Sequence, residues 1–214
     1  MTILQFAIIA VCAYLLGSLS FAIIVSKVTL GKDIRDYGSG NAGLTNAYRT
    51  MGAGKTLFVL LGDIAKGAAA VAIGMLLAGP IGKLTAGIFV ILGHMFPLYF
   101  GFRGGKGVLV GAVMLALFDW RVFLIALALF LAAVFATRWI SLGSILGAIS
   151  FPISTFFFYH DQVLTAMAFG MAAAVVFMHR SNIARMLNGT ENQFSFKSKK
   201  TIESTEKDEK GTDA

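Results

Sequence analysis

The sequence is poor in cysteine and in charged residues. Its 214 residues include a single cysteine, Cys12, so no disulfide can form within the chain. Charged residues make up 14% of the chain, whereas they make up about a quarter of a typical soluble domain. Because 57% of the residues are hydrophobic and the mean hydropathy is +0.78, the composition is typical of an integral membrane protein.

Several signatures of catalysis and metal binding are also missing. The chain has no G-x-S-x-G elbow, no H-E-x-x-H motif and no H-x₄-D acid/base pair. No cluster of cysteine, histidine and carboxylate residues has metal-ligand spacing, so we expect neither a metal nor another cofactor. The glycine-rich segment "GGKG" lacks the spacer and the Ser/Thr of a Walker A loop, so ATP is not indicated.

Seven apolar runs follow one another, and each is expected to form a membrane-spanning helix. They are residues 3–25, 56–78, 84–101, 107–118, 121–137, 141–158 and 163–178. The run 107–118 is short for a span, which predicts a tilted or re-entrant helix. The first run is too long for a signal peptide, so we expect it to be retained as a helix. The sequence therefore predicts an all-α integral membrane protein built as a seven-transmembrane-helix bundle.

Composition divides the chain into two parts. Residues 1–192 are predicted to form one polytopic membrane domain. Residues 193–214 are polar, mixed in charge and low in apolar content, which predicts a disordered cytoplasmic tail.

The uneven distribution of basic residues predicts the orientation. If the N-terminus is outside, the inside segments are 26–55, 102–106, 138–140 and 179–214, and they carry 15 of the 18 lysines and arginines. The positive-inside rule thus predicts an external N-terminus and a cytoplasmic C-terminus. The net charge of +7 reflects this topology, so nucleic acid is not expected as a partner.

Three polar, glycine-rich stretches fall on the predicted cytoplasmic side. They are "GSGNAGLTNAYRT" (38–50), "FRGGKGV" (102–108) and "HRSNIARMLNGTEN" (179–192). Taken singly, "GGKG" is explained by a tight turn with an anchoring lysine, whereas the serine, two asparagines and arginine of the first stretch exceed what a turn needs. Together the three stretches predict one site. Glycines let backbone N–H groups approach an anion, and Lys and Arg suit phosphate. The expected ligand is therefore anionic, with one or two phosphates.

Two charged residues lie inside a predicted span. Asp63 and Lys66 are three residues apart on one face of a helix, which predicts an ion pair that supports the site. Direct contact with substrate is the alternative. His94 is expected to be a hydrogen-bonded structural histidine, although it is also a candidate to line a pocket. Asp119 and Asp161 lie at the outer ends of predicted helices and are expected to be helix caps or solvated loop residues.

The three motifs, together with "GDIAKG" and "GHMFP", resemble those of the bacterial acyl-phosphate:glycerol-3-phosphate acyltransferases, the PlsY family. The resemblance covers residues 1–192. It implies a multi-pass enzyme of the bacterial inner membrane with its active site on the cytoplasmic face. Such an enzyme transfers a fatty acyl group from acyl phosphate to the 1-hydroxyl of sn-glycerol 3-phosphate during phospholipid synthesis. The products are lysophosphatidate and inorganic phosphate. Besides the two substrates, the implied partners are membrane lipid and the enzyme that makes acyl phosphate.

The resemblance also implies roles for individual residues. The implied catalytic residues are Ser39, Arg49, Lys106, His179 and Asn182. The implied substrate- and phosphate-binding residues are Asn41, Gly43, Asn46, Gly104, Gly105, Gly107, Arg180 and Glu191. Lys106 and its neighbouring glycine N–H groups, with Ser39 and Arg49, are expected to hold the acyl phosphate. His179 and Asn182 are expected to orient glycerol 3-phosphate.

Two questions stay open at this stage. The proton acceptor is either His179 or a substrate phosphate, and we favour the phosphate because no carboxylate at short spacing orients the histidine.

A transporter of an organic phosphate or a non-catalytic lipid-binding subunit is the rival function. A transporter would have repeats and polar groups near the bilayer midplane, where only Asp63 and Lys66 fit.

Overall fold

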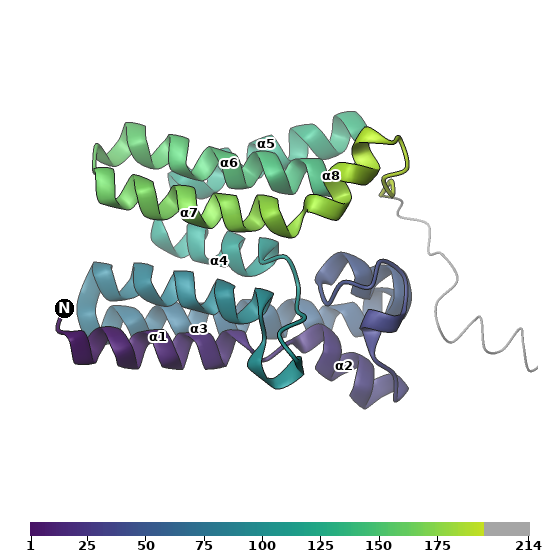
Figure 1. Cartoon of the computed structure of the whole chain (residues 1–214), viewed down its shortest axis with the longest axis horizontal. Coiled ribbons are helices and arrows are strands. Elements are labelled where there is room, and N and C mark those ends of the chain that lie inside the picture. The colour runs from purple at the N-terminus through teal and green to yellow at the C-terminus, as the bar shows by residue number, and fades with distance from the viewer. Residues whose placement is uncertain (195–214) are drawn as a thin grey trace, which may run out of the picture. The chain divides into compact units, whose positions relative to one another are not determined.

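The computed structural model describes residues 1–194, and every regular element within them is a helix (Figure 1). The predicted all-α fold is therefore confirmed. Most of the predicted tail, residues 195–214, lies outside the described residues. The elements are α1 (Ile3–Gly17), α2 (Phe21–Leu30), η1 (Ile34–Asp36), α3 (Leu44–Met95), η2 (Leu98–Phe100), α4 (Val108–Phe118), α5 (Trp120–Thr137), α6 (Ile140–Tyr159), α7 (Gln162–Met178) and α8 (Arg180–Leu187).

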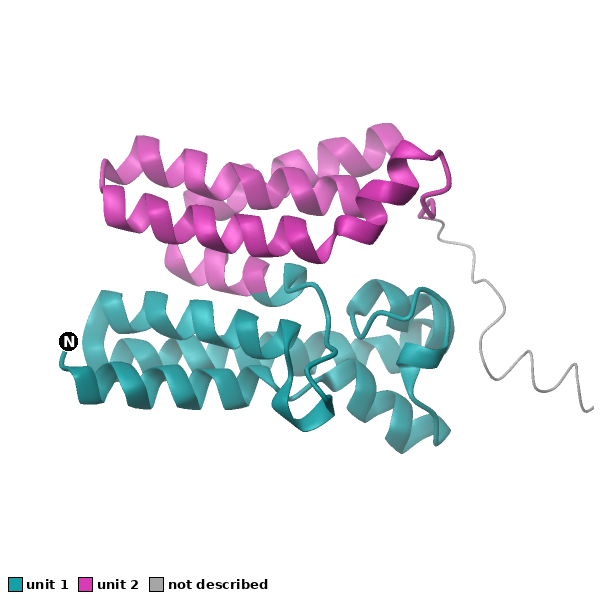
Figure 2. Cartoon of the chain, viewed as in Figure 1, with its two compact units in different colours: residues 1–110, 196–214 teal, residues 111–195 magenta. Residues whose placement is uncertain are grey.

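The chain separates into two compact units (Figure 2). Among the described residues, unit 1 comprises residues 1–110 and unit 2 comprises residues 111–194. The first and second polar motifs therefore belong to unit 1, and the third belongs to unit 2.

Four helices are long and apolar enough to cross a membrane: Ile3–Leu30, Leu44–Phe100, Trp120–Thr137 and Ile140–Tyr159. A fifth is added if α7 and α8, which are bent by 58°, count as one span. The helix α4 is shorter, as the run 107–118 predicted. Each of the seven predicted apolar runs contains a helix, but the run 84–101 is helical only as far as Met95 and then continues into η2.

The long helix α3 is a hairpin of two arms, residues 44–77 and 80–95. The first arm has a break at Gly52, where φ is +76°, and the backbone leaves helical geometry again at Ala78 and Gly79, which Pro80 follows. Gly74 and Gly82 then face each other so closely that a Cβ on either would strike the carbonyl oxygen of the other. The two arms contain the helical parts of the predicted apolar runs 56–78 and 84–101.

The first predicted helix is interrupted, which corrects the expectation of one continuous helix over 3–25. Helix α1 ends at Gly17 and α2 begins at Phe21. The Ser18 hydroxyl donates to the Tyr14 carbonyl at 2.8 Å and accepts from the Leu98 amide at 3.1 Å. The break leaves backbone carbonyls inside the unit, and a buried lysine binds two of them, as described below.

Helix α1 packs along both arms of α3 (Figure 1). Near its start, Gln5 donates to the Leu77 carbonyl at 2.9 Å, and Phe6 packs edge-to-face on Phe89. Near its end, the Tyr14 hydroxyl donates to the Phe96 carbonyl at 2.6 Å. These contacts fix the end of the second arm, from which the second polar motif begins.

Unit 2 contains α5, α6, α7 and α8, which follow one another through short connections. The Asp119 carboxylate accepts from the Arg121 amide at 2.8 Å at the start of α5. The Asp161 carboxylate accepts from the Leu164 amide at 2.9 Å at the start of α7. The predicted capping roles of Asp119 and Asp161 are therefore confirmed.

Candidate functional site

The first motif is a tight loop closed by a buried asparagine. In loop 1 (residues 31–43), the Asn46 side chain accepts from the Ser39 amide at 2.9 Å and donates to the Ile34 and Tyr37 carbonyls at 3.3 and 3.1 Å. Gly38 has φ +61°, and a Cβ there would strike Asn46 Oδ1. Asn46 is 1% exposed. Its amide is committed to the loop backbone, which differs from the direct phosphate contact expected from the sequence.

Loop 1 ends at the N-terminus of α3. Gly43 is the N-cap residue, and no side chain caps the first turn. Uncapped N–H groups at a helix start carry partial positive charge and suit an anion. Ser39 is exposed and Asn41 is half-buried within the loop, while Arg49 is half-buried on α3. These residues place donors of the predicted type around one helix end.

The glycines of the second motif are used differently from the expectation. In loop 2 (residues 96–107), the Gly104 amide donates to the Met95 carbonyl at 3.2 Å and the Gly105 amide donates to the His94 carbonyl at 3.1 Å. These two N–H groups are engaged by the end of α3, so they do not form the predicted phosphate nest. Their role is to bind loop 2 to the helix.

Gly105 is also where the two loops meet. A Cβ on Gly105 would lie 2.8 Å from the Ala42 carbonyl oxygen and would strike His94 Nε2. Only glycine allows the backbone of loop 2 to approach loop 1 so closely. Lys106 and Gly107 follow directly, with Lys106 half-buried and Gly107 buried. The structure thus brings the first and second motifs together within unit 1.

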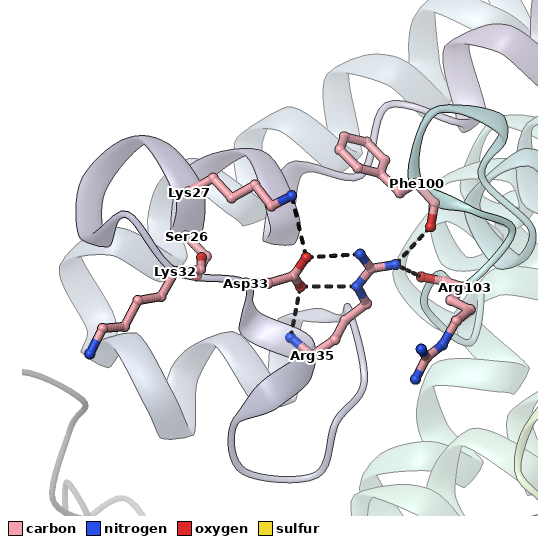
Figure 3. A network of polar contacts seen from close by, with 7 residues as sticks. All are labelled: Ser26, Lys27, Lys32, Asp33, Arg35, Phe100 and Arg103. Atoms are coloured by element: carbon pink, nitrogen blue, oxygen red, sulfur yellow. Dashed lines mark hydrogen bonds and ion pairs between the residues drawn. The ribbon is translucent and has the colours of Figure 1, made fainter.

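A second link between loops 1 and 2 is made by Asp33 and Arg35 (Figure 3). The Arg35 guanidinium holds the Asp33 carboxylate through Nε and Nη2 at 2.9 and 2.8 Å. Its Nη1 donates to the carbonyls of Phe100 and Arg103, at 2.7 and 3.2 Å. The hydrogen bond from Arg35 lowers the pKa of Asp33 to about 2. The carboxylate is therefore ionised at neutral pH and holds the guanidinium in place.

A buried ionic cluster lies within α3, next to the break between α1 and α2. Lys66 Nζ is 2.8 Å from Asp63 Oδ1, and both side chains are 1% exposed. The same ammonium donates to the Gly17 and Leu19 carbonyls at 3.1 and 2.7 Å. It also lies 3.0 Å from His94 Nδ1. Asp63 and Lys66 thus form an ion pair, and His94 is hydrogen-bonded within it.

The third motif is organised around Glu191 in unit 2. Its Oε1 accepts from Ser141 Oγ and from Asn182 Nδ2, both at 2.7 Å, and its Oε2 accepts from Arg185 Nε at 2.8 Å. Asn182 Nδ2 also donates to Ser141 Oγ at 2.6 Å. Burial acts to raise the pKa of Glu191, but these hydrogen bonds outweigh it and the pKa lies below its ordinary value.

This network changes the roles expected for two residues. Glu191 is a buried carboxylate, which repels an anion, so the structure gives it a bracing role rather than the phosphate contact expected from the sequence. The Asn182 amide nitrogen is directed at Ser141 and Glu191. It therefore fixes α8 against the start of α6.

His179 lies at the bend between α7 and α8. Its Nδ1 is 2.8 Å from the Val175 carbonyl oxygen. Because a carbonyl only accepts hydrogen bonds, Nδ1 carries the proton in this contact, and Nε2 is the acceptor of the neutral ring. His179 is buried, whereas the neighbouring Arg180 is exposed and lies over the Phe177 ring.

Two features of the site do not follow from the sequence motifs. Arg35 is one of the basic residues of 26–55 that indicate topology, and the pattern Asp-x-Arg at 33–35 also permits a fork within the loop. Ser141 has no motif around it, and only the fold brings it to Glu191. No group of three or more His, Cys, Asp or Glu residues suited to a metal occurs within residues 1–194. The prediction that the third motif shares a site with the first two stays a prediction.

Comparison with known proteins places these motifs in a family. The family model for glycerol-3-phosphate acyltransferase matches residues 7–189. A glycerol-3-phosphate acyltransferase of Geobacillus kaustophilus (strain HTA426) is 38% identical over 195 residues, covering 91% of this chain and 99% of the relative. One from Bacillus subtilis (strain 168) is 39% identical over 185 residues, covering 86% and 95%.

Solved structures agree with the sequence relatives. The crystal structure of PlsY (YgiH), an integral membrane glycerol 3-phosphate acyltransferase, in its glycerol 3-phosphate form has a TM-score of 0.82 and 33% identity, covering 89% of this chain and 96% of that one. The lysophosphatidic acid form has a TM-score of 0.79 and 31% identity, covering 89% and 95%. The chain is thus an all-α integral membrane protein, and it belongs to the glycerol-3-phosphate acyltransferase family.

Proposed function

We propose that this protein transfers a fatty acyl group from acyl phosphate to the 1-hydroxyl of sn-glycerol 3-phosphate, giving lysophosphatidate and inorganic phosphate. Family membership supports the acceptor and the reaction type. The related crystal structures are of glycerol 3-phosphate and lysophosphatidic acid forms, which agrees with this acceptor and product. Acyl phosphate as the donor follows from the resemblance of the three motifs to those of the PlsY family.

The observation that carries the proposal is the meeting of loops 1 and 2 at Ala42 and Gly105. It gathers the Lys106 region and the uncapped start of α3 in one part of unit 1. Ser39 and Arg49 belong to the same part of the chain. We assign the phosphate of the acyl donor to Lys106, Ser39, Arg49 and the first amides of α3. Asn46 and the amides of Gly104 and Gly105 position the loops.

The chemistry needs charge neutralisation more than acid catalysis, because acyl phosphate is already activated. The 1-hydroxyl oxygen attacks the acyl carbonyl carbon and forms the ester bond. The bond from that carbon to the phosphate oxygen breaks, and inorganic phosphate leaves. Cationic groups on the phosphate and donors at the carbonyl oxygen stabilise the developing charge. The hydroxyl proton goes to His179 Nε2 or to a substrate phosphate, whose second pKa is about 6.

The structure adds a reason to keep His179 as a candidate base. The sequence offered no group to orient the ring, but the Val175 carbonyl binds Nδ1. That contact sets the tautomer in which Nε2 accepts a proton. If His179→Ala loses the chemical step while glycerol 3-phosphate still binds with wild-type affinity, the histidine is the base. If the loss is entirely in binding, the substrate phosphate is the base.

The membrane topology is part of the same proposal. We place the chain in the bacterial cytoplasmic membrane, with the N-terminus outside and loops 1 and 2 on the cytoplasmic face, because the basic residues concentrate in those segments. The catalytic domain covers residues 1–192. The enzyme that makes acyl phosphate is the proposed protein partner.

The proposal is tested by mixing purified protein with acyl phosphate and glycerol 3-phosphate and measuring phosphate release. We expect release that depends on both substrates and is almost abolished in Lys106→Ala. Wild-type turnover by Lys106→Ala would remove the phosphate assignment. Uptake of glycerol 3-phosphate into vesicles without phosphate release would favour the transporter instead.

A further inference from the structure

Arg35 lies outside the three motifs, yet it is the side chain that ties loop 1 to loop 2 (Figure 3). We propose that Arg35, held by Asp33, is a positioning residue that sets loop 2, and with it Lys106, against the start of α3. The proposal rests on the function proposed above, in which Lys106 binds the donor phosphate.

The hydrogen bonds of Arg35 leave little capacity for a substrate. A guanidinium has five N–H donors. Four donate within the protein, two to the Asp33 carboxylate and two to the carbonyls of Phe100 and Arg103. The side chains of Arg35 and Asp33 are 18% and 17% exposed. Arg35 is therefore built into the protein framework and does not act as a surface charge that attracts anions.

The two carbonyls that Arg35 holds lie on either side of a strained turn. Gly101 has φ +65°, and Phe102 has φ +58°, an unfavourable backbone conformation for a residue with a side chain. Such conformations persist where surrounding contacts hold them. Arg35 binds the carbonyl before this turn, at Phe100, and the carbonyl after it, at Arg103. The Phe102 amide donates to the Pro97 carbonyl at 2.9 Å.

Loop 2 is thus held at two places. Arg35 holds its turn, and the amides of Gly104 and Gly105 hold its later part on α3. Lys106 follows directly. If Arg35 is lost, Phe102 is free to relax toward an ordinary backbone conformation and the later part of loop 2 shifts with it. A displacement of about 1 Å at a catalytic group is enough to cost roughly 100-fold in rate.

The test compares Arg35→Ala and Arg35→Lys with the wild-type protein. Lysine keeps the charge but lacks the planar fork, so it cannot reproduce the four hydrogen bonds that Arg35 makes to the Asp33 carboxylate and to the carbonyls of Phe100 and Arg103. We expect both variants to lower kcat for phosphate release by roughly 10- to 100-fold, with little change in the KM for glycerol 3-phosphate. Full activity in Arg35→Lys would show that charge alone is needed, and it would overturn the positioning role.

Hydrogen–deuterium exchange of residues 98–107 gives a readout that does not depend on activity. We expect faster exchange in both Arg35 variants, because the bonds of Gly104 and Gly105 to α3 open more often, and unchanged exchange in the second arm of α3. Unchanged exchange in loop 2 would also overturn the proposal. If Arg35→Ala does not fold, Arg35→Lys decides the question alone.

The chain supplies a matched control in unit 2. Arg121 makes the same fork with Asp119, through Nε at 3.1 Å and Nη2 at 2.7 Å. Arg121→Ala removes an Asp-x-Arg fork without touching loops 1 and 2, so its phosphate release should equal that of the wild type. Lys106→Ala separates the two proposals. If Lys106→Ala is inactive and Arg35→Lys is fully active, the inference fails and the proposed function stands. If Lys106→Ala turns over at the wild-type rate, the assignment of the donor phosphate to Lys106 fails and this inference fails with it, whereas the proposed function fails only if the wild-type protein releases no phosphate.

Discussion

Replacement of Gly105 by alanine tests how closely loops 1 and 2 must approach. The added Cβ would lie 2.8 Å from the Ala42 carbonyl oxygen, whereas ordinary van der Waals contact begins at 3.4 Å. The backbones must therefore separate by about 0.6 Å to restore ordinary contact. The same Cβ would strike His94 Nε2, and the ring cannot easily turn away because Nδ1 contacts Lys66 at 3.0 Å.

We expect Gly105→Ala to lose activity more than stability. Overpacking of this kind costs about 1–3 kcal/mol in the free energy of unfolding. A shift of this size next to Lys106 should lower the turnover roughly 10- to 100-fold. Phosphate release by purified protein measures the turnover, and thermal unfolding in the same detergent measures the stability.

Gly54→Ala is the matched control for this experiment. Gly54 is in α3, and a Cβ there would meet nothing within 4 Å. Gly54 lies two residues after the break at Gly52, and since an added methyl group meets no atom there, alanine should not destabilise the protein and should leave turnover unchanged. Wild-type turnover in Gly105→Ala would refute the view that the contact between the loops sets the position of Lys106.

Four further predictions concern the groups that hold the site. Asn46→Ala leaves buried loop groups without partners and should cost about 1–3 kcal/mol, measured by thermal unfolding. Lys66→Met leaves the Asp63 carboxylate buried and unpaired, which should cost about 3–5 kcal/mol, and a second change of Asp63→Leu should recover part of that loss. The lowered pKa of Glu191 means that its carboxylate stabilises the fold above its ordinary pKa of 4.5 and loses this effect as the pH falls, so acid unfolding of Glu191→Gln should be less steep. For Asp33, the corresponding stability is complete above pH 3.8 and is lost as the pH falls toward about 2, and Asp33→Asn should remove that part of an acid titration followed by circular dichroism.

The sequence predicts the helices and the polar motifs because both depend on local composition. Each apolar run contains a helix, and Asp119 and Asp161 cap the helices that follow them. The Asp63–Lys66 pair was also predictable, since residues three apart on a helix share a face and a charge inside a span needs a partner.

Contacts between distant segments were not predictable in the same way. Nothing near Lys66 in the sequence indicates that it binds the carbonyls of Gly17 and Leu19, because that requires α1 to break beside α3. The glycines of the second motif suggested a phosphate nest, but the amides of Gly104 and Gly105 face the end of α3. Glycines in a sequence indicate that the backbone approaches another group closely, but the identity of that group depends on the fold.

The central claim is that acyl phosphate is the donor and glycerol 3-phosphate the acceptor. It is tested most directly by giving the purified protein glycerol 3-phosphate with either acyl phosphate or acyl-CoA, and measuring lysophosphatidate and phosphate in the same sample. We predict equimolar lysophosphatidate and phosphate from acyl phosphate and no product from acyl-CoA. Lysophosphatidate made from acyl-CoA, or phosphate released without lysophosphatidate, would contradict the proposed reaction.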